Sequence, residues 1–143
     1  MTSNDRWATL VVVSDATRRR LLWIAATDAT FELDRERGVV EGKCIHCRRR
    51  LRLRRDGTPI SRATVEHIVA RTHGGTDELE NLAIACSACN AGKGHRLDVR
   101  RPDDPKLLEV QATLQRRRRE RWRDPPEDWD LPPRPRASDS STA

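Results

Sequence analysis

The sequence is poor in aromatic residues, which make up 3% of its 143 residues, and its hydrophobic residues make up only 36%. A chain of this length is the size of one ordinary domain, and this composition supports only a modest hydrophobic core. Chains with small cores often depend on a bound metal for stability. We therefore expect one domain that contains a structural metal site.

Long hydrophobic runs are also missing. No stretch approaches the ~18 apolar residues of a membrane span, and the N-terminus lacks the basic and apolar regions of a secretory leader. We therefore expect a cytoplasmic protein. In that compartment paired cysteines are more often metal ligands than disulfides.

Acidic residues are too few to balance the basic ones, and the net charge is +6. The basic excess lies in residues 1–123, whereas residues 124–143 carry a net negative charge. A basic domain favours an anionic partner, nucleic acid before an acidic protein. The prolines and the Ser/Thr-rich end of residues 124–143 predict a disordered tail.

The cysteines form two C-x2-C knuckles, Cys44-Ile-His-Cys47 and Cys86-Ser-Ala-Cys89. Each short gap lets one tight turn present two sulfurs, so the four thiolates predict a tetrahedral structural Zn2+ site. A disulfide framework is the alternative. Residues 48–85 separate the knuckles by more than the roughly 15 to 20 residues of a plain zinc ribbon, so further structure must lie between them.

That intervening segment carries several chemically informative residues. Glu66 precedes His67, a Gly74-Gly75 pair permits a tight loop, and Asn81 starts a short apolar run. Asn90 directly follows the last cysteine. In this order, over about residues 43 to 97, the sequence resembles the HNH endonuclease family.

The resemblance implies an α+β fold: a ββα-metal (His-Me finger) core stapled by the four-cysteine zinc site, with flanking N- and C-terminal helices. It implies that His67 is the general base, that Glu66 and Asn90 hold the catalytic ion, and that Asn81 braces the loop. Oxygen ligands suit Mg2+ or Mn2+ at that second site. The sequence departs from the family pattern at Glu66, where Asp is commoner, at Ala70, where Pro is frequent, and at Asn90, where the family name refers to His.

Nucleic-acid contacts are expected first from a strand after the first knuckle. Alternation puts Arg50, Arg52 and Arg54 on one face, and residues 56–59 have the composition of a turn, which predicts a hairpin. The arginine row suits phosphates, although a merely solvated cationic face is the alternative. Further expected contacts are Arg71, His73 and Lys93.

The flanking segments predict helices. Ser14 and Asp15 are candidate caps for a helix from residue 16 to about residue 37 that Gly38 ends, with a scaffolding or a dimerisation role. Residues 10–13 suit either a strand or the start of a helix. A second helix over residues 105 to about 122 ends in a cluster of arginines that either grip DNA or only favour the helix C-terminus.

The predicted organisation is a helical flank (1–42), a nuclease unit (43–101), a basic helix (102–123) and a tail (124–143). The predicted function is metal-dependent hydrolysis of DNA, expected to be double-stranded. The main alternative is a zinc-stapled DNA-binding module that does not cleave. A protein-interaction adaptor is a third hypothesis, which leaves the basic surface unexplained.

Overall fold

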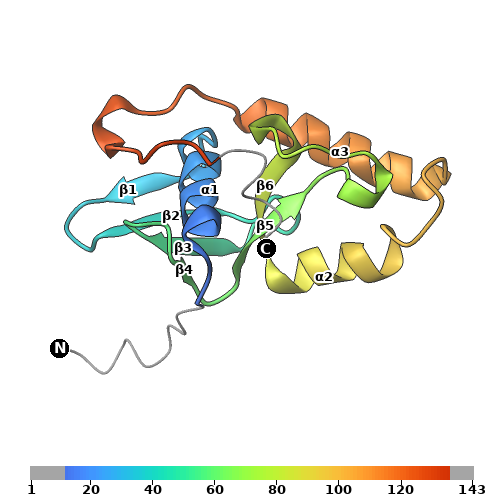
Figure 1. Cartoon of the computed structure of the whole chain (residues 1–143), viewed down its shortest axis with the longest axis horizontal. Helices are drawn as coiled ribbons and strands as arrows, with labels where there is room; N and C mark the ends of the chain where they lie inside the picture. The colour runs from blue at the N-terminus through green and yellow to red at the C-terminus, as the bar shows by residue number, and fades with distance from the viewer. Residues whose placement is uncertain (1–11, 136–143) are drawn as a thin grey trace.

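The computed structural model describes residues 12–135, which form an α+β fold of helices and small antiparallel sheets (Figure 1). Leu10 and Val11 of the predicted apolar run lie outside the described residues, and residues 12–14 lie in neither a helix nor a strand. The α-helices and strands, in chain order, are α1 (Asp15–Ala26), β1 (Glu32–Asp34), β2 (Val39–Lys43), β3 (Arg50–Arg54), β4 (Pro59–Ile60), β5 (Ala63–His67), β6 (Leu82–Cys86), α2 (Ser87–Arg96) and α3 (Pro105–Arg121).

Helix α1 begins as predicted but ends early. The Ser14 side chain caps it by accepting a hydrogen bond from the Thr17 N–H at 3.1 Å. The predicted continuation to residue 37 is wrong, because the Asp28 carboxylate accepts a hydrogen bond from the Thr30 N–H at 2.8 Å and turns the chain into β1. Gly38 lies in the turn between β1 and β2 with φ 68°, so it does not end a helix.

The first sheet has the order β1-β2-β3-β4, and its neighbouring strands are antiparallel. The predicted hairpin is confirmed: Leu51 and Leu53 of β3 are buried, and the arginines between them are exposed. Phe31 packs directly over Gly42 of β2, where an added Cβ would lie 2.3 Å from the Phe31 ring. Buried side chains of α1 and of both sheets form one hydrophobic cluster.

The second sheet is the hairpin of β5 and β6, followed at once by α2. The register pairs Ala63 with Cys86 and His67 with Leu82. Every residue of β6 is buried, which explains its uninterrupted apolar sequence. The chain therefore contains the strand, strand, helix unit expected from the sequence, and Figure 1 shows it at the end of the molecule away from β1.

Helix α3 starts at Pro105, with Asp104 capping it through hydrogen bonds from the N–H groups of Lys106 and Leu107. The arginines near its C-terminus donate hydrogen bonds to backbone carbonyls of other elements. Neither sequence hypothesis, contact with DNA or stabilisation of the helix C-terminus, anticipated these contacts. Arg117 donates to Ile45 and His46, Arg118 to Thr27 and Leu79, Arg121 to Lys43 and Cys44, and Arg123 beyond the helix to Ala25, Ala26 and Phe31.

Arg118 is the most deeply placed of these arginines, with 2% of its surface exposed. Burial lowers the pKa of Arg118 to about 10, so the guanidinium remains charged near neutral pH. It also lies over the Trp122 ring, 4.7 Å from the centroid. Arg118 therefore joins the end of α1 to Leu79, two residues before Asn81, in a water-excluded position.

We predict that Arg118→Met lowers the free energy of unfolding by about 2–3 kcal/mol, because the carbonyls of Thr27 and Leu79 lose their buried donor. Chemical denaturation measures the change. Arg119→Met, on the exposed neighbouring position, is the matched control and should change stability by less than about 0.5 kcal/mol. Equal effects of the two substitutions would show that the carbonyl contacts contribute little.

The segment after α3 packs back over α1 (Figure 1). The Trp23 indole donates to the Pro132 carbonyl at 2.8 Å, and the Trp129 side chain is buried. The prediction of a disordered tail is therefore wrong for residues 124–135, because two tryptophans anchor them. Residues 136–143 of the predicted tail lie outside the described residues. Among residues 12–135, no helix combines the length and apolar character needed to span a membrane.

Candidate active site and metal centre

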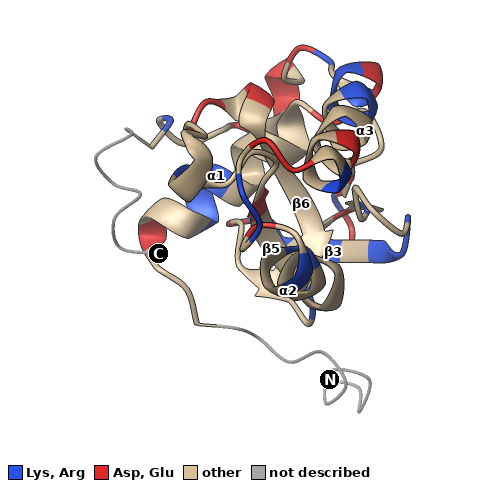
Figure 2. Cartoon of the chain, turned by 90° about the vertical axis from the view of Figure 1, so that its right-hand side faces the viewer, with Lys and Arg blue, Asp and Glu red and all other residues tan. Residues whose placement is uncertain are grey.

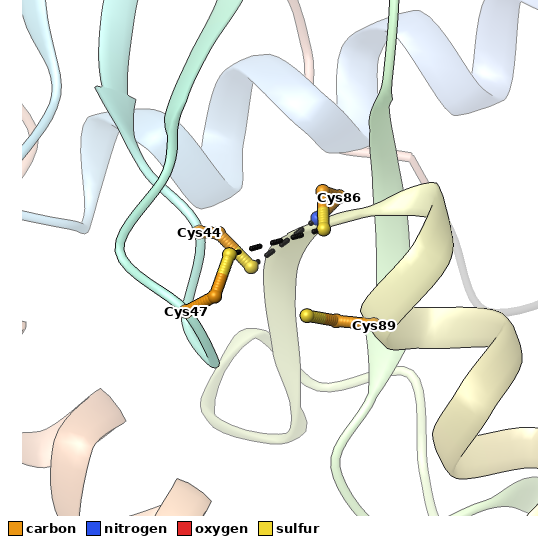
Figure 3. A group of neighbouring side chains, drawn as sticks. All are labelled: Cys44, Cys47, Cys86 and Cys89. Atoms are coloured by element: carbon orange, nitrogen blue, oxygen red, sulfur yellow. Dashed lines mark hydrogen bonds between the residues drawn. The ribbon is translucent and has the colours of Figure 1, made fainter.

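The four cysteine sulfurs converge in one place (Figure 3), where all the candidate ligand atoms lie within 4.8 Å of one another. The first knuckle follows β2, and the second joins the end of β6 to the first turn of α2. Antiparallel pairing of β5 with β6 and of β2 with β3 thus carries two distant knuckles to the same point. The structure positions these cysteines to form a metal site.

Backbone geometry shapes the first knuckle. Arg48 adopts a left-handed conformation with φ 64°, and its N–H donates to the Cys44 carbonyl at 3.1 Å. The Cys44 sulfur accepts hydrogen bonds from the N–H groups of His46 at 3.4 Å and Cys86 at 3.3 Å. These two backbone donors therefore hold the Cys44 sulfur in place.

The donor set fits a thiolate-bound cation. The cysteines form no disulfide with one another, and the sulfurs of Cys47 and Cys86 are 4.0 Å apart. Tetrahedral Zn–S bonds of about 2.3 Å place sulfurs roughly 3.8 Å apart. Burial, and then the neighbouring cysteine sulfurs, raises the pKa of the Cys89 thiol above its ordinary value. A bound cation offsets the free-energy cost of ionising these buried, neighbouring thiols, because it pairs with the thiolates.

His67 ends β5 and lies at a cleft of about 330 Å³. Its Nε2 is 2.7 Å from Oδ1 of Asp77, which also accepts from the Arg71 guanidinium at 3.0 Å. The cleft is lined by Val65, His67, Ala70, Arg71, Thr72, Asn90 and Asp98. The structure therefore brings His67 and Asn90 to one cleft, and it adds Asp77 as a partner of the histidine.

Asp77 is a residue that the sequence analysis missed. It follows the glycine pair by two residues and resembles an ordinary polar loop residue. Only closure of the loop over residues 68–81 brings it back to His67, so no local pattern identifies it.

The loop between His67 and β6 is held by the residues predicted to shape it. Gly74 has φ 85°, and a Cβ on Gly75 would lie 1.7 Å from the Val69 carbonyl oxygen, so the two glycines are needed for different reasons. Asn81 accepts a hydrogen bond from the Val69 N–H at 2.9 Å and donates to the carbonyls of Val69 and Thr76. The expected loop-bracing hydrogen bonds of Asn81 are present.

Glu66 lies on β5, and its side chain is on the opposite face of the strand from that of His67. Its side chain is 1% exposed, and its Oε1 is 2.5 Å from Nε2 of His46. Oε2 is buried without a hydrogen-bond partner, and the nearest cation is the Lys93 ammonium at 3.8 Å. The pairing of Glu66 with His46, inside the first knuckle, was not predicted.

Lys93 does not match its prediction. Its side chain is 2% exposed, and its ammonium donates to the His67 carbonyl at 3.1 Å and to both oxygens of Asp98 at 3.0 Å. The prediction that Lys93 contacts nucleic acid is therefore wrong, because α2 buries this side chain against β5.

Asn90 lies one turn before Lys93 on α2. Its amide nitrogen donates to Thr64 Oγ1 at 3.1 Å and to the Val65 carbonyl at 3.0 Å. Hydrogen bonds between the described residues use only this nitrogen, so Oδ1 remains available. Thr64 and Glu66 are two residues apart on one face of β5. Asn90 and Glu66 thus reach the same seam between β5 and α2.

The remaining predicted contacts lie on the surface. Arg50, Arg52 and Arg54 are exposed on β3, which is banded with basic residues in Figure 2. The Glu41 carboxylate of β2 lies 3.8 Å from Nε of Arg50 and 4.0 Å from Nε of Arg52. The positive charge of the arginine row is therefore partly compensated. Arg71 is exposed, and His73 is half-buried with its Nδ1 unpartnered.

Residues 44–96 match the family model for the HNH endonuclease. This match confirms the resemblance over these residues and identifies the segment as an HNH endonuclease domain. The match covers both knuckles, the β5–β6 hairpin and α2, and leaves α1 and α3 outside. No curated protein and no solved structure matches the chain.

Proposed function

We propose that this protein is a metal-dependent endonuclease that hydrolyses phosphodiester bonds of double-stranded DNA. The observation that carries the proposal is the His67 side chain, held by Asp77 in a cleft that it shares with Asn90. A histidine oriented by a carboxylate beside an oxygen ligand is an arrangement suited to general base catalysis next to a metal. The family of residues 44–96 supports the same reaction class.

His67 acts as the general base. Because the Asp77 carboxylate accepts a hydrogen bond, Nε2 carries the proton, and Nδ1 is left with the lone pair. We infer this tautomer from the hydrogen bond. Nδ1 then takes a proton from the attacking water, and Asp77 stabilises the resulting imidazolium.

The residues of the seam between β5 and α2 fit a hard divalent cation, Mg2+ or Mn2+. Asn90 offers its free Oδ1, and Glu66 offers a buried carboxylate oxygen without a hydrogen-bond donor. When bound, such an ion stabilises the anionic transition state and the departing 3′-oxygen. Asn81 keeps the loop, and with it Asp77, in place.

A structural Zn2+ ion is proposed for Cys44, Cys47, Cys86 and Cys89. Thiolate ligands need reduced cysteines, which favours the cytoplasm as the place of action. We propose residues 43–101 as the catalytic unit, with residues 1–42 and 102–123 as its support, since the arginines of α3 donate to carbonyls of the first knuckle.

We predict that Asp77→Asn lowers kcat by about 10-fold or more, because the orienting carboxylate also stabilises the imidazolium that forms during the reaction. Steady-state cleavage of a labelled duplex measures this change. Asp103→Asn, at an exposed position before α3, is the control. Unchanged kcat in Asp77→Asn would remove Asp77 from the mechanism.

The exposed arginines of β3 are proposed to contact DNA phosphates, together with Arg71 and His73. Replacing Arg50, Arg52 and Arg54 with Gln should weaken DNA binding and reduce the slope of log K against log salt by about one per lost contact. Fluorescence anisotropy at several salt concentrations measures the slope. If the slope stays the same, the arginine row is only a solvated face. The nearby Glu41 carboxylate favours that alternative.

The direct test is incubation of the purified protein with supercoiled plasmid, with and without Mg2+ or Mn2+. Nicked or linear product that requires the metal supports the proposal. One observation favours the alternative, a zinc-stapled DNA-binding module: the Lys93 ammonium already lies opposite Glu66 and neutralises part of its charge. Binding of DNA without cleavage in any divalent metal would establish that alternative.

A further inference from the structure

A chain of buried polar contacts connects the metal centre to the proposed active site. His46 Nε2 contacts Glu66 Oε1 at 2.5 Å, Lys93 Nζ lies 3.8 Å from Glu66 Oε2, and the same ammonium donates to the His67 carbonyl at 3.1 Å. Glu66 and Lys93 are almost fully buried. These contacts therefore lie in a low-dielectric region, where each contact is strong and its loss is costly.

The first residue in this series of contacts, His46, is held in place by the first knuckle. His46 lies between Cys44 and Cys47, its N–H donates to the Cys44 sulfur at 3.4 Å, and its carbonyl accepts from Arg117 at 3.1 Å. Its backbone is therefore held by the metal centre on one side and by α3 on the other. The imidazole projects from this fixed position to Glu66.

The second end lies on the elements that carry the proposed catalytic residues. Glu66 directly precedes His67 on β5, and Lys93 follows Asn90 by one turn of α2. Among the described residues, His46 makes the one hydrogen bond to the Glu66 carboxylate. Without this hydrogen bond, the remaining charged neighbour of the carboxylate among the described residues is the Lys93 ammonium.

We propose that His46 is a positioning residue that couples the four-cysteine metal centre to the active site through Glu66 and Lys93, an inference that rests on the proposed nuclease function. His46 holds Glu66 back from Lys93, which leaves the ammonium free to bind the His67 carbonyl. If His46 lost its donor, Glu66 would draw Lys93 away from that carbonyl. His67 and Asn90 would then lose the alignment that β5 and α2 give them.

The test compares His46→Leu, which keeps the bulk but removes the donor, with His46→Gln, whose amide can donate at a similar reach. In His46→Leu, kcat for cleavage of a labelled duplex should fall by about 10- to 100-fold, as for other residues that orient a metal ligand. KM and the zinc content should stay near the wild-type values. His46→Gln should recover most of kcat.

His95→Leu is the matched control, since His95 is exposed on α2 and lines none of the cleft around His67. It should leave kcat unchanged. A His46→Leu protein that cleaves like the control would overturn the proposal. If His46→Leu loses zinc or unfolds, His46→Gln and His46→Asn decide instead: the shorter Asn cannot reach Glu66, so equal kcat values for Gln and Asn would overturn it.

A second readout does not depend on cleavage. The ring resonances of His67 in a 1H–15N spectrum should shift in His46→Leu and remain unchanged in His95→Leu. Unshifted His67 resonances would overturn the coupling whether or not the protein cuts DNA. If the wild-type protein never cleaves DNA but the His67 resonances still shift in His46→Leu, the result contradicts the proposed function and supports the coupling.

Discussion

His67→Ala is expected to lower the rate of DNA cleavage by about 100-fold or more, because it removes the general base from the cleft. His67 contributes no ligand to the cysteine centre, and its side chain is not part of the hydrophobic cluster. The variant should therefore stay folded, retain zinc and bind DNA with near wild-type affinity. Single-turnover cleavage and anisotropy on the same preparation measure both properties.

His95→Ala is the control for this substitution and should cut DNA at the wild-type rate. Glu66→Gln and Asn90→Ala should also lower cleavage, because each removes an oxygen ligand proposed for the catalytic ion. Raised Mn2+ should partly restore these two variants and should not restore His67→Ala. The nuclease proposal fails if wild-type protein and His67→Ala leave DNA uncut to the same extent in Mg2+, Mn2+, Co2+ and Ni2+.

Cys47→Ser is expected to lower the free energy of unfolding by several kcal/mol, because a closed thiolate site contributes its binding free energy to folding. The effect should be large here because the hydrophobic core is modest and both knuckles hold neighbouring elements. Zinc content by elemental analysis and chemical denaturation measure the loss. Cleavage should fall with it, since the second knuckle forms the start of α2, which carries Asn90.

Arg49→Ser is the control for the cysteine substitution. Arg49 lies two residues after Cys47, but its contact with Cys44 is made by its backbone carbonyl, which the substitution keeps. Zinc content and stability should therefore remain near wild type. Wild-type protein that contains no metal, with thiols that react freely in the native state, would contradict the zinc site.

Features that depend on neighbouring residues were predictable. The alternation in residues 50–54, the cap at Ser14 and the proline at the start of α3 each have a local physical cause, and each is confirmed. The end of α1 was not predictable, since the apolar spacing continues past Ala26 while Asp28 turns the chain and β1 pairs with β2. Pairing between strands depends on partners that a local pattern does not contain.

The arginines after residue 115 show the same limit for charge. A cluster of arginines at a helix end predicts a cationic surface, yet four of them donate to carbonyls of α1, the first knuckle and the loop before Asn81. Sequence alone cannot distinguish a guanidinium in water from one that satisfies buried acceptors. That distinction depends on how closely α3 packs against the rest of the fold.

The sequence by itself determined that this chain has four cysteines spaced for a metal site and a segment of the HNH type, because both follow from which residues stand at which spacing along the chain. Only the tertiary structure decided which partners these residues have. Asp77 reaches His67, and His46 reaches Glu66, across separations of 10 and 20 residues. Such contacts follow from loop closure and strand packing. The free energy of that packing comes from the whole core, so the residues adjacent to either partner do not reveal the contact.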